Sequence, residues 1–185
     1  MSTTRTLIAA TDLSAPARHA AERAAQLAER HPGARLTLAH VVSAGALDAL
    51  RRLLAGEAGA LESELLQRAG KDLAALAADL ASCLGCQVDT ELLRGSPPAA
   101  LAALAEVREA DLLVTGARGT RFLRELLPGP TAERMLRTAR RPVLIVKQRP
   151  QAPYRRILAA VDFSVHAAAA IDAAHAGCLT RTSCC

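Results

Sequence analysis

Short apolar runs, rich in leucine and β-branched residues, alternate along this chain with longer stretches rich in alanine. Apolar runs of about four to eight residues between turn signals are typical of buried strands. They predict strands at Thr6–Ala10, Arg35–Val42, Gln87–Leu93, Asp111–Thr115 and Pro142–Lys147. Because strands and helical stretches alternate regularly, the pattern predicts an α/β fold with a parallel sheet covered by helices on both faces.

The stretch 61–82 has the periodicity of an amphipathic helix. Apolar side chains recur every three or four residues, at Leu61, Leu65, Leu66, Ala69, Leu73, Leu76 and Leu80. Side chains at this spacing share one face of a helix. We therefore expect a helix that packs by one face.

A second helix is predicted after Gly95. Ser96 suits the cap position, and Pro97 suits the first turn because the missing N–H has no partner there. We expect this helix to direct Leu101, Leu104 and Val107 inward and to end at the charged residues 108 and 109.

The longest connection is Ser43–Ala60, which carries four leucines beside Arg51 and Arg52. It is interpreted either as a lid or short amphipathic helix over a site, or as a surface helix packed against its neighbour. Long connections are only sometimes functional, which favours the surface helix.

The beginning of the chain is repeated near its end. Arg5–Ser14 aligns without gaps with Arg155–Ser164, and an alanine-rich stretch follows each copy. We therefore predict a first domain at 1–150 and the start of a second copy at 151–185. One strand and one helix cannot bury a core alone, so the second copy is interpreted as a truncated half of a tandem protein.

Composition restricts the class of protein. Apolar residues make up 51% of the 185 residues, but aromatic residues only 2%, so the core must consist of Leu, Val, Ile and Ala. No run approaches the roughly 20 apolar residues of a membrane span, and the N-terminus leads directly into a strand. We expect a soluble, cytoplasmic protein.

The formal net charge of +5 comes almost entirely from arginine. This charge permits contact with phosphate or nucleic acid. Nucleic-acid binding is not expected, because Phe122, Tyr154 and Phe163 are scattered and form no stacking platform.

Cysteine usage does not predict a disulfide framework. The five cysteines are Cys83, Cys86, Cys178, Cys184 and Cys185. Cys83 and Cys86 have the spacing of metal or redox pairs, but a zinc site usually takes four ligands. Two thiols at a helix end are the favoured alternative.

The strongest functional signal lies between 111 and 147. An apolar strand stops at Gly116, Gly119 follows, and a helix is expected just after Gly129. Glycines permit close approach of the backbone, and a helix N-terminus presents N–H donors in a positive field. The segment therefore predicts a phosphate-binding loop.

With this loop and the turn Asp12-Leu13-Ser14, the chain resembles the universal stress proteins, a flavodoxin-like α/β family some of whose members bind ATP. The resemblance covers residues 5–148 as a full domain and 155 to about 177 as the start of another. Its phosphate motif is Gly-x2-Gly-x9-Gly-(Ser/Thr). It implies a five-stranded parallel sheet, a role in the stress response and a bound adenine nucleotide.

The resemblance also implies which residues contact the nucleotide. Asp12 and Val41 match the positions that contact the adenosine half, with Ala10 and Thr11 beside Asp12. The expected set is Ala10, Thr11, Asp12, Val41, Gly116, Arg118, Gly119, Gly129, Pro130 and Thr131. Asp12 or Ser14 has an alternative role as a helix cap. His40 lies beside Val41 but shows no partner in the sequence, so catalysis by this histidine is not expected.

The chain departs from the family motif at Pro130, where the pattern requires Ser or Thr. Proline removes a backbone donor and a hydroxyl from the position that would face the terminal phosphates. One lost charge-assisted hydrogen bond costs about 1.5–3 kcal/mol. Thr131 and the arginines 118, 121 and 124 are candidate replacements, although solvated loop residues are the favoured interpretation of these arginines.

The sequence therefore predicts a protein that binds ATP without catalysis and acts through its conformation or its partners. No Walker motif occurs, since Gly70-Lys71-Asp72 lacks its upstream glycine and hydroxyl, and efficient ATP hydrolysis is not expected. The alternative is a scaffold protein whose site is degenerate because of Pro130. The resemblance also implies that the apolar strand Val143–Val146 lies at a sheet edge through which family members pair. Exposed apolar edges are normally paired, so we expect a homodimer through this strand.

Overall fold

The computed structural model describes residues 5–53, 58–84, 87–117, 130–154, 156–158, 162, 167, 168, 171 and 172, with only the backbone at 58, 84 and 130. The chain divides into two compact units, Met1–Arg149 and Pro150–Cys185. Of the described residues in the second unit, 156–158 lie in no strand, whereas 167, 168, 171 and 172 are helical. That this unit begins a second copy of the first stays a prediction.

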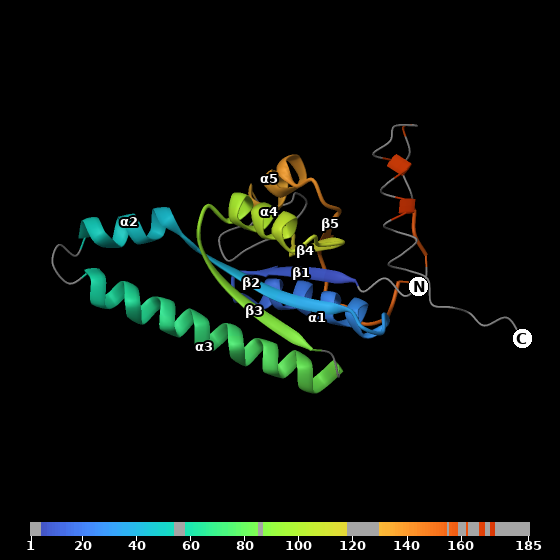
Figure 1. Ribbon diagram of the computed structural model, residues 1–185, viewed down its shortest axis with the longest axis horizontal. Coiled ribbons are helices and arrows are strands. Elements are labelled where there is room, and N and C mark those ends of the chain that lie inside the picture. The colour runs from blue at the N-terminus through green and yellow to red at the C-terminus, as the bar shows by residue number, and fades with distance from the viewer. Residues whose placement is uncertain are drawn as a thin grey trace, which may run out of the picture. The chain divides into compact units, whose positions relative to one another are not determined.

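The first unit is built on a five-stranded parallel sheet (Figure 1). Its strands are β1 (Thr6–Thr11), β2 (Arg35–Ser43), β3 (Val88–Gly95), β4 (Leu112–Gly116) and β5 (Val143–Val146). The spatial order is β3-β2-β1-β4-β5, so the chain moves outward from β1 to β3 and returns to the other side of β1 at β4. The predicted flavodoxin-like α/β fold is confirmed. The order of the strands reverses between β1 and β4, where ligands of such sheets usually bind.

Helices cover both faces of this sheet (Figure 1). They are α1 (Ala15–Glu29), α2 (Ala44–Leu53), α3 (Ala58–Leu84), α4 (Pro97–Val107) and α5 (Pro130–Thr138). One core cluster joins α1 and α3 to the sheet, and a second joins α4 and α5 to the opposite face. Both predicted helices, 61–82 and the one after Gly95, are confirmed.

Alanine sets the spacing of the first core cluster. The face of α1 that packs on the sheet is formed by Ala20, Ala21, Ala24, Ala25 and Ala28, all nearly inaccessible to solvent. Small side chains let the helix backbone approach the strands closely, and Leu36, Leu38 and Leu73 fill the remaining space. This packing explains how a chain with 2% aromatic residues builds a core.

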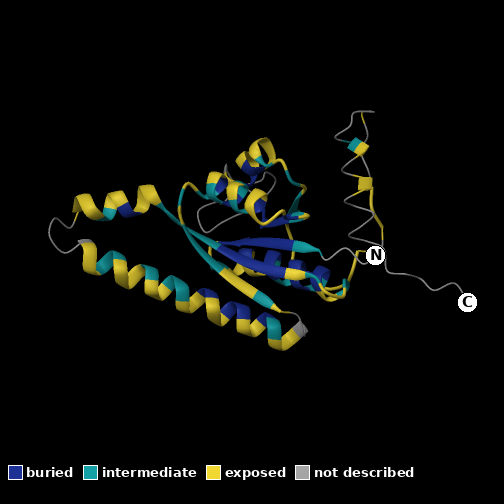
Figure 2. Ribbon diagram, in the orientation of Figure 1, coloured by how far each residue is buried: buried dark blue, intermediate teal, exposed yellow. Residues whose placement is uncertain are grey.

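Two expectations about the inward faces of the helices were wrong in part. Val107 is 79% exposed, because Leu101 and Ala105, one turn apart, define the buried face of α4 and Val107 lies off it. Leu65 is 43% exposed, because the buried residues of α3 all lie in its C-terminal half, from Leu73 to Leu80. Figure 2 shows this gradient along α3.

The long connection contains a surface helix, α2, packed against α3. Its one buried residue is Leu47, and Figure 2 shows most of α2 as exposed. The Arg51 guanidinium donates two hydrogen bonds to Glu62 Oε2, at 2.8 and 3.1 Å, and Arg94 reaches the same carboxylate at 3.5 Å. Glu62 therefore ties α2 and the end of β3 to α3. None of the described helices is long and apolar enough to cross a membrane.

Candidate functional site

The turn after β1 is organised by Asp12 and Ser14. Ser14 is the N-cap of α1, and its hydroxyl accepts a hydrogen bond from the Ala17 amide at 3.3 Å. Asp12 Oδ1 accepts from the Ser14 amide at 3.1 Å and also from the Ser14 hydroxyl. The capping role is therefore confirmed for Ser14, with Asp12 orienting it. Asp12 is exposed at the carboxyl edge of the sheet, where the predicted ligand role stays a prediction.

Two hydrogen bonds to Thr11 order the carboxyl end of β1 and the turn after it. Leu13 has a positive φ of 63°, and its amide donates to Thr11 Oγ1 at 3.0 Å. His40 Nδ1 lies 2.8 Å from the Thr11 carbonyl. A carbonyl oxygen only accepts, so Nδ1 carries the proton. The expectation that His40 has no partner was wrong, because the parallel register places His40 opposite Thr11.

Ala10 and Val41 have roles in the core. Ala10 is 7% exposed and belongs to the cluster beneath α4 and α5, and Val41 is partly buried against that cluster. Both lie near the carboxyl ends of their strands. They therefore place apolar surface next to the edge at which Asp12 is exposed.

Gly116 ends β4 in the predicted place. It is buried, and the Ala117 amide following it still donates to the Val146 carbonyl of β5 at 2.9 Å. Thr115 lies opposite Ala10 in the register of β4 and β1. Gly116 therefore stands at the point where the strand order reverses.

The phosphate loop itself lies outside the described residues. This holds for Arg118, Gly119 and Gly129 of the predicted site and for the arginines at 121 and 124. The structure describes the chain again at Pro130, the first residue of α5, so the predicted helix just after Gly129 is confirmed. Thr131, the next residue, is exposed.

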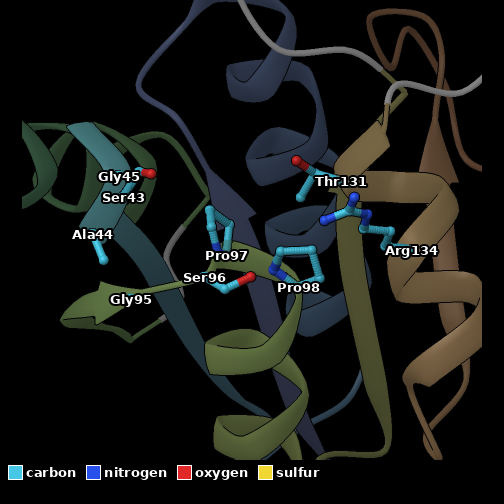
Figure 3. Close-up of a pocket in the computed structure, with 9 residues that line it drawn as sticks. All are labelled: Ser43, Ala44, Gly45, Gly95, Ser96, Pro97, Pro98, Thr131 and Arg134. Atoms are coloured by element: carbon cyan, nitrogen blue, oxygen red, sulfur yellow. The ribbon is translucent and has the colours of Figure 1, made fainter. Parts of the chain in front are cut away.

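A pocket of ≈ 310 Å³ lies at the carboxyl edge of the sheet (Figure 3). Its lining residues come from the β2–α2 junction, the β3–α4 turn and the first turn of α5; they are Ser43, Ala44, Gly45, Gly95, Ser96, Pro97, Pro98, Thr131 and Arg134. Figure 3 shows the Ser96–Pro98 turn between the β2 end on one side and Thr131 with Arg134 on the other. Of the predicted site residues that the structure describes, Thr131 alone lines it.

The sequence signal for this pocket was incomplete. Gly95, with a φ of +129°, and the two prolines after it were interpreted as a helix start and not as a site. Ser43 and Arg134 stand in no motif, and only the register of β2 with β3 brings Ser43 opposite Gly95. The pairing of β2 with β3 brings Ser43 and Gly95 together, and no local sequence pattern predicts this part of the pocket.

The lining has the chemistry of an anion site. Among the described lining residues Arg134 alone is charged, and Ser43, Ser96 and Thr131 supply hydroxyl groups. No group of three or more His, Cys, Asp or Glu suited to a metal occurs in the part of the chain that the structure describes. Cys83 is a free, exposed thiol, and Cys86 lies outside the described residues.

A family model and a curated relative both show similarity of this chain to universal stress proteins. The model of the "Universal stress protein family" matches residues 3–147. The universal stress protein MJ0531 of Methanocaldococcus jannaschii is 38% identical over 88 residues, which is 48% of this chain and 52% of that protein. The chain thus aligns with about half the length of this curated relative.

Solved structures share the fold. The structure of protein MJ0577 superposes with a TM-score of 0.64 at 21% identity, over 80% of this chain and 98% of that one. A universal stress protein crystallised in complex with cAMP superposes with a TM-score of 0.52 at 25% identity, over 78% of this chain and 97% of that one.

Proposed function

Because the chain belongs to the universal stress protein family, we propose that it binds an adenine nucleotide without catalysis and acts in the stress response through its conformation or its partners. The observation that carries the proposal is the pocket at the carboxyl edge of the parallel sheet, lined by hydroxyl groups and one guanidinium. The cAMP complex of a 25% identical family member supports an adenine nucleotide as the ligand.

The position of the site follows from the topology. Thr11 and Gly116 end two adjacent strands at the reversal point of the sheet, and α5 begins on the same edge. In open parallel sheets, ligands bind outside the carboxyl ends of the strands at such points. We place the nucleotide over this edge, with its phosphate side toward α5.

The adenosine half would contact the β1 and β2 ends. The Asp12 carboxylate accepts hydrogen bonds and is suited to a ribose hydroxyl or an adenine amino group. Val41 and Ala10 supply apolar contact. His40 holds the Thr11 carbonyl at 2.8 Å and so positions the backbone that carries Asp12.

The proposal is for a binding protein and not for an ATPase. The sequence has no Walker lysine in its glycine loop, and Pro130 replaces the Ser or Thr of the family motif. A nucleotide held this way acts as a signal by binding one conformation more tightly than another, which shifts the population toward that conformation.

Isothermal titration of the full chain with AMP, cAMP and ATP tests the proposal. We expect saturable binding of one nucleotide per chain. Absence of heat with all three at millimolar concentration would contradict it and favour the scaffold alternative.

A pair of variants separates the two roles of the β1 turn. Ser14→Ala removes the cap of α1 and should cost about 1 kcal/mol of stability while leaving nucleotide affinity unchanged. Asp12→Ala should lower affinity as well. Equal affinities for the two variants would limit Asp12 to orienting the cap.

We further propose that the chain forms a homodimer through β5. This strand is at one edge of the sheet, and its apolar residues Val143, Leu144 and Ile145 are only half-buried, which leaves apolar surface in solvent. A charge on an edge strand opposes pairing. Sedimentation velocity should show a dimer for the wild type and a monomer for Ile145→Lys; a wild-type monomer at high concentration would refute the dimer.

A further inference from the structure

One cation, Arg134, faces the pocket from α5. Figure 3 shows its guanidinium beside Pro98 and near Thr131. Thr131 and Arg134 are three residues apart and therefore share one face of the helix. Both are exposed and both line the pocket.

The buried residues of α5 hold this face in place. Ala132 is 2% exposed and Met135 is fully buried in the cluster that joins α5 to the sheet. These two residues are also three apart and anchor the helix directly beside Thr131 and Arg134. Core packing therefore fixes the face of α5 that carries Arg134 toward the pocket.

The charge of Arg134 is not paired with any of the residues that the structure describes. Two nearby arginines are paired: Arg137, on the same helix, with Glu133 at 3.2 Å, and Arg141, beyond the end of the helix, with Glu106 at 3.4 Å. Arg134 forms no ion pair or side-chain hydrogen bond with any residue that the structure describes. The described residues that line the pocket include no carboxylate that would neutralise the guanidinium.

The hydroxyl groups of the lining are equally available. Ser96 occupies the cap position of α4, but its side chain makes no capping hydrogen bond. Pro97 and Pro98 carry no N–H, so the helix start offers fewer backbone donors than usual. The side chains available to an anion here are those of Ser43, Ser96, Thr131 and Arg134.

We propose that Arg134 is the phosphate-recognition residue of this chain, and that the pocket takes a single phosphate group of an adenine nucleotide. This inference rests on the proposed nucleotide-binding function and specifies its ligand as a nucleoside monophosphate. A guanidinium matches phosphate geometry and forms strong, charge-assisted hydrogen bonds. The volume of ≈ 310 Å³ falls within the range of ligand pockets, which run from about 300 to 1,000 Å³, and has room for a phosphate group beside the guanidinium.

Pro130 supports the same choice. It removes a donor at the position that the family motif uses for terminal phosphates, while Arg134, one turn further along α5, retains a cation. A second or third phosphate of a nucleotide is therefore expected to add less to the binding affinity than the first.

Isothermal titration of the full chain with adenosine, AMP and ATP tests this assignment. For the wild type we expect AMP to bind about ten- to a hundred-fold more tightly than adenosine, and ATP no more tightly than AMP. Arg134→Gln should reduce AMP affinity to that of adenosine and leave adenosine binding unchanged. Arg134→Lys should retain part of the difference, because lysine keeps the charge without the planar fork.

Arg137→Gln is the matched control, since Arg137 is an exposed arginine on the same helix that is paired with Glu133. It should bind AMP as the wild type does. Equal AMP affinity for Arg134→Gln and Arg137→Gln, or equal wild-type affinity for AMP and adenosine, overturns the role of Arg134 but leaves nucleotide binding intact. ATP binding far more tightly than AMP overturns the single-phosphate site. If the wild type binds none of the three compounds, the proposed function fails and this assignment with it.

Discussion

The anchoring of α5 by Met135 can be tested by one substitution. Met135 is fully buried in the cluster formed with Ile8, Leu101 and Leu113. Replacing it with alanine removes the Cγ, Sδ and Cε atoms and leaves a cavity between α5 and the sheet. Because α5 carries Arg134, the change should weaken both the fold and the pocket.

The expected magnitude follows from the burial. Three buried groups of methylene size correspond to about 2.4 kcal/mol at roughly 0.8 kcal/mol each. The residual cavity adds to this cost, and buried Met→Ala changes as a class cost about 2–5 kcal/mol. Leu136→Ala is the matched control, because Leu136 is 51% exposed and alanine is an equally good helix former.

Urea unfolding followed by circular dichroism measures the difference. At an unchanged m-value, the midpoint for Met135→Ala should fall by an amount equivalent to about 2–5 kcal/mol, and that for Leu136→Ala by less than about 1 kcal/mol. Nucleotide affinity should fall only for Met135→Ala. Equal midpoints for the two variants would refute the packing of α5 on this core.

Three further changes address the loop motif, the α2 contact and the β3 turn. Pro130→Ser restores the family residue and should raise ATP affinity about ten- to a hundred-fold with a smaller gain for AMP; titration showing equal gains would contradict this reasoning. Glu62→Gln weakens the contact between α2, α3 and β3 and should cost about 1–2 kcal/mol in thermal unfolding, whereas the exposed Glu64→Gln should cost nothing measurable. Gly95→Ala should lower the free energy of unfolding by about 1–3 kcal/mol because of the φ of +129° at Gly95, although a Cβ there has open space. Gly59→Ala, also with open space but without a positive φ, should stabilise the protein. A higher Tm for Gly95→Ala than for Gly59→Ala would argue against strain at Gly95.

Most of the fold could be predicted from local pattern. Each strand was predicted to within two residues at either end, because β-branched and leucine runs stop abruptly at turn residues such as Asp12 and Gly95. The leucine spacing predicts burial along the whole apolar face of α3, whereas only the C-terminal half of that face is buried. The spacing indicates which face is apolar but not how far the sheet extends beneath it. Leu65 shows the difference.

The candidate site was predictable only where it follows from a linear motif. Asp12, Gly116 and the start of α5 lie at element ends that the sequence marks. The contact between His40 and Thr11, and the wall formed by Ser43 with Gly95, depend on strand register. Arg134 was missed because an arginine on a helix is ordinarily solvated, and only the placement of α5 brings it to the pocket.

Chemical-shift mapping by NMR tests the central claim most directly. On titration of the labelled chain with AMP, we predict that the largest amide shifts occur at the carboxyl edge of the sheet, at Asp12, Gly95, Gly116 and Thr131. Shifts concentrated at the opposite edge, where Asp111 accepts from the Thr6 amide at 2.8 Å, or no shifts at millimolar AMP, would contradict a nucleotide site at the carboxyl edge.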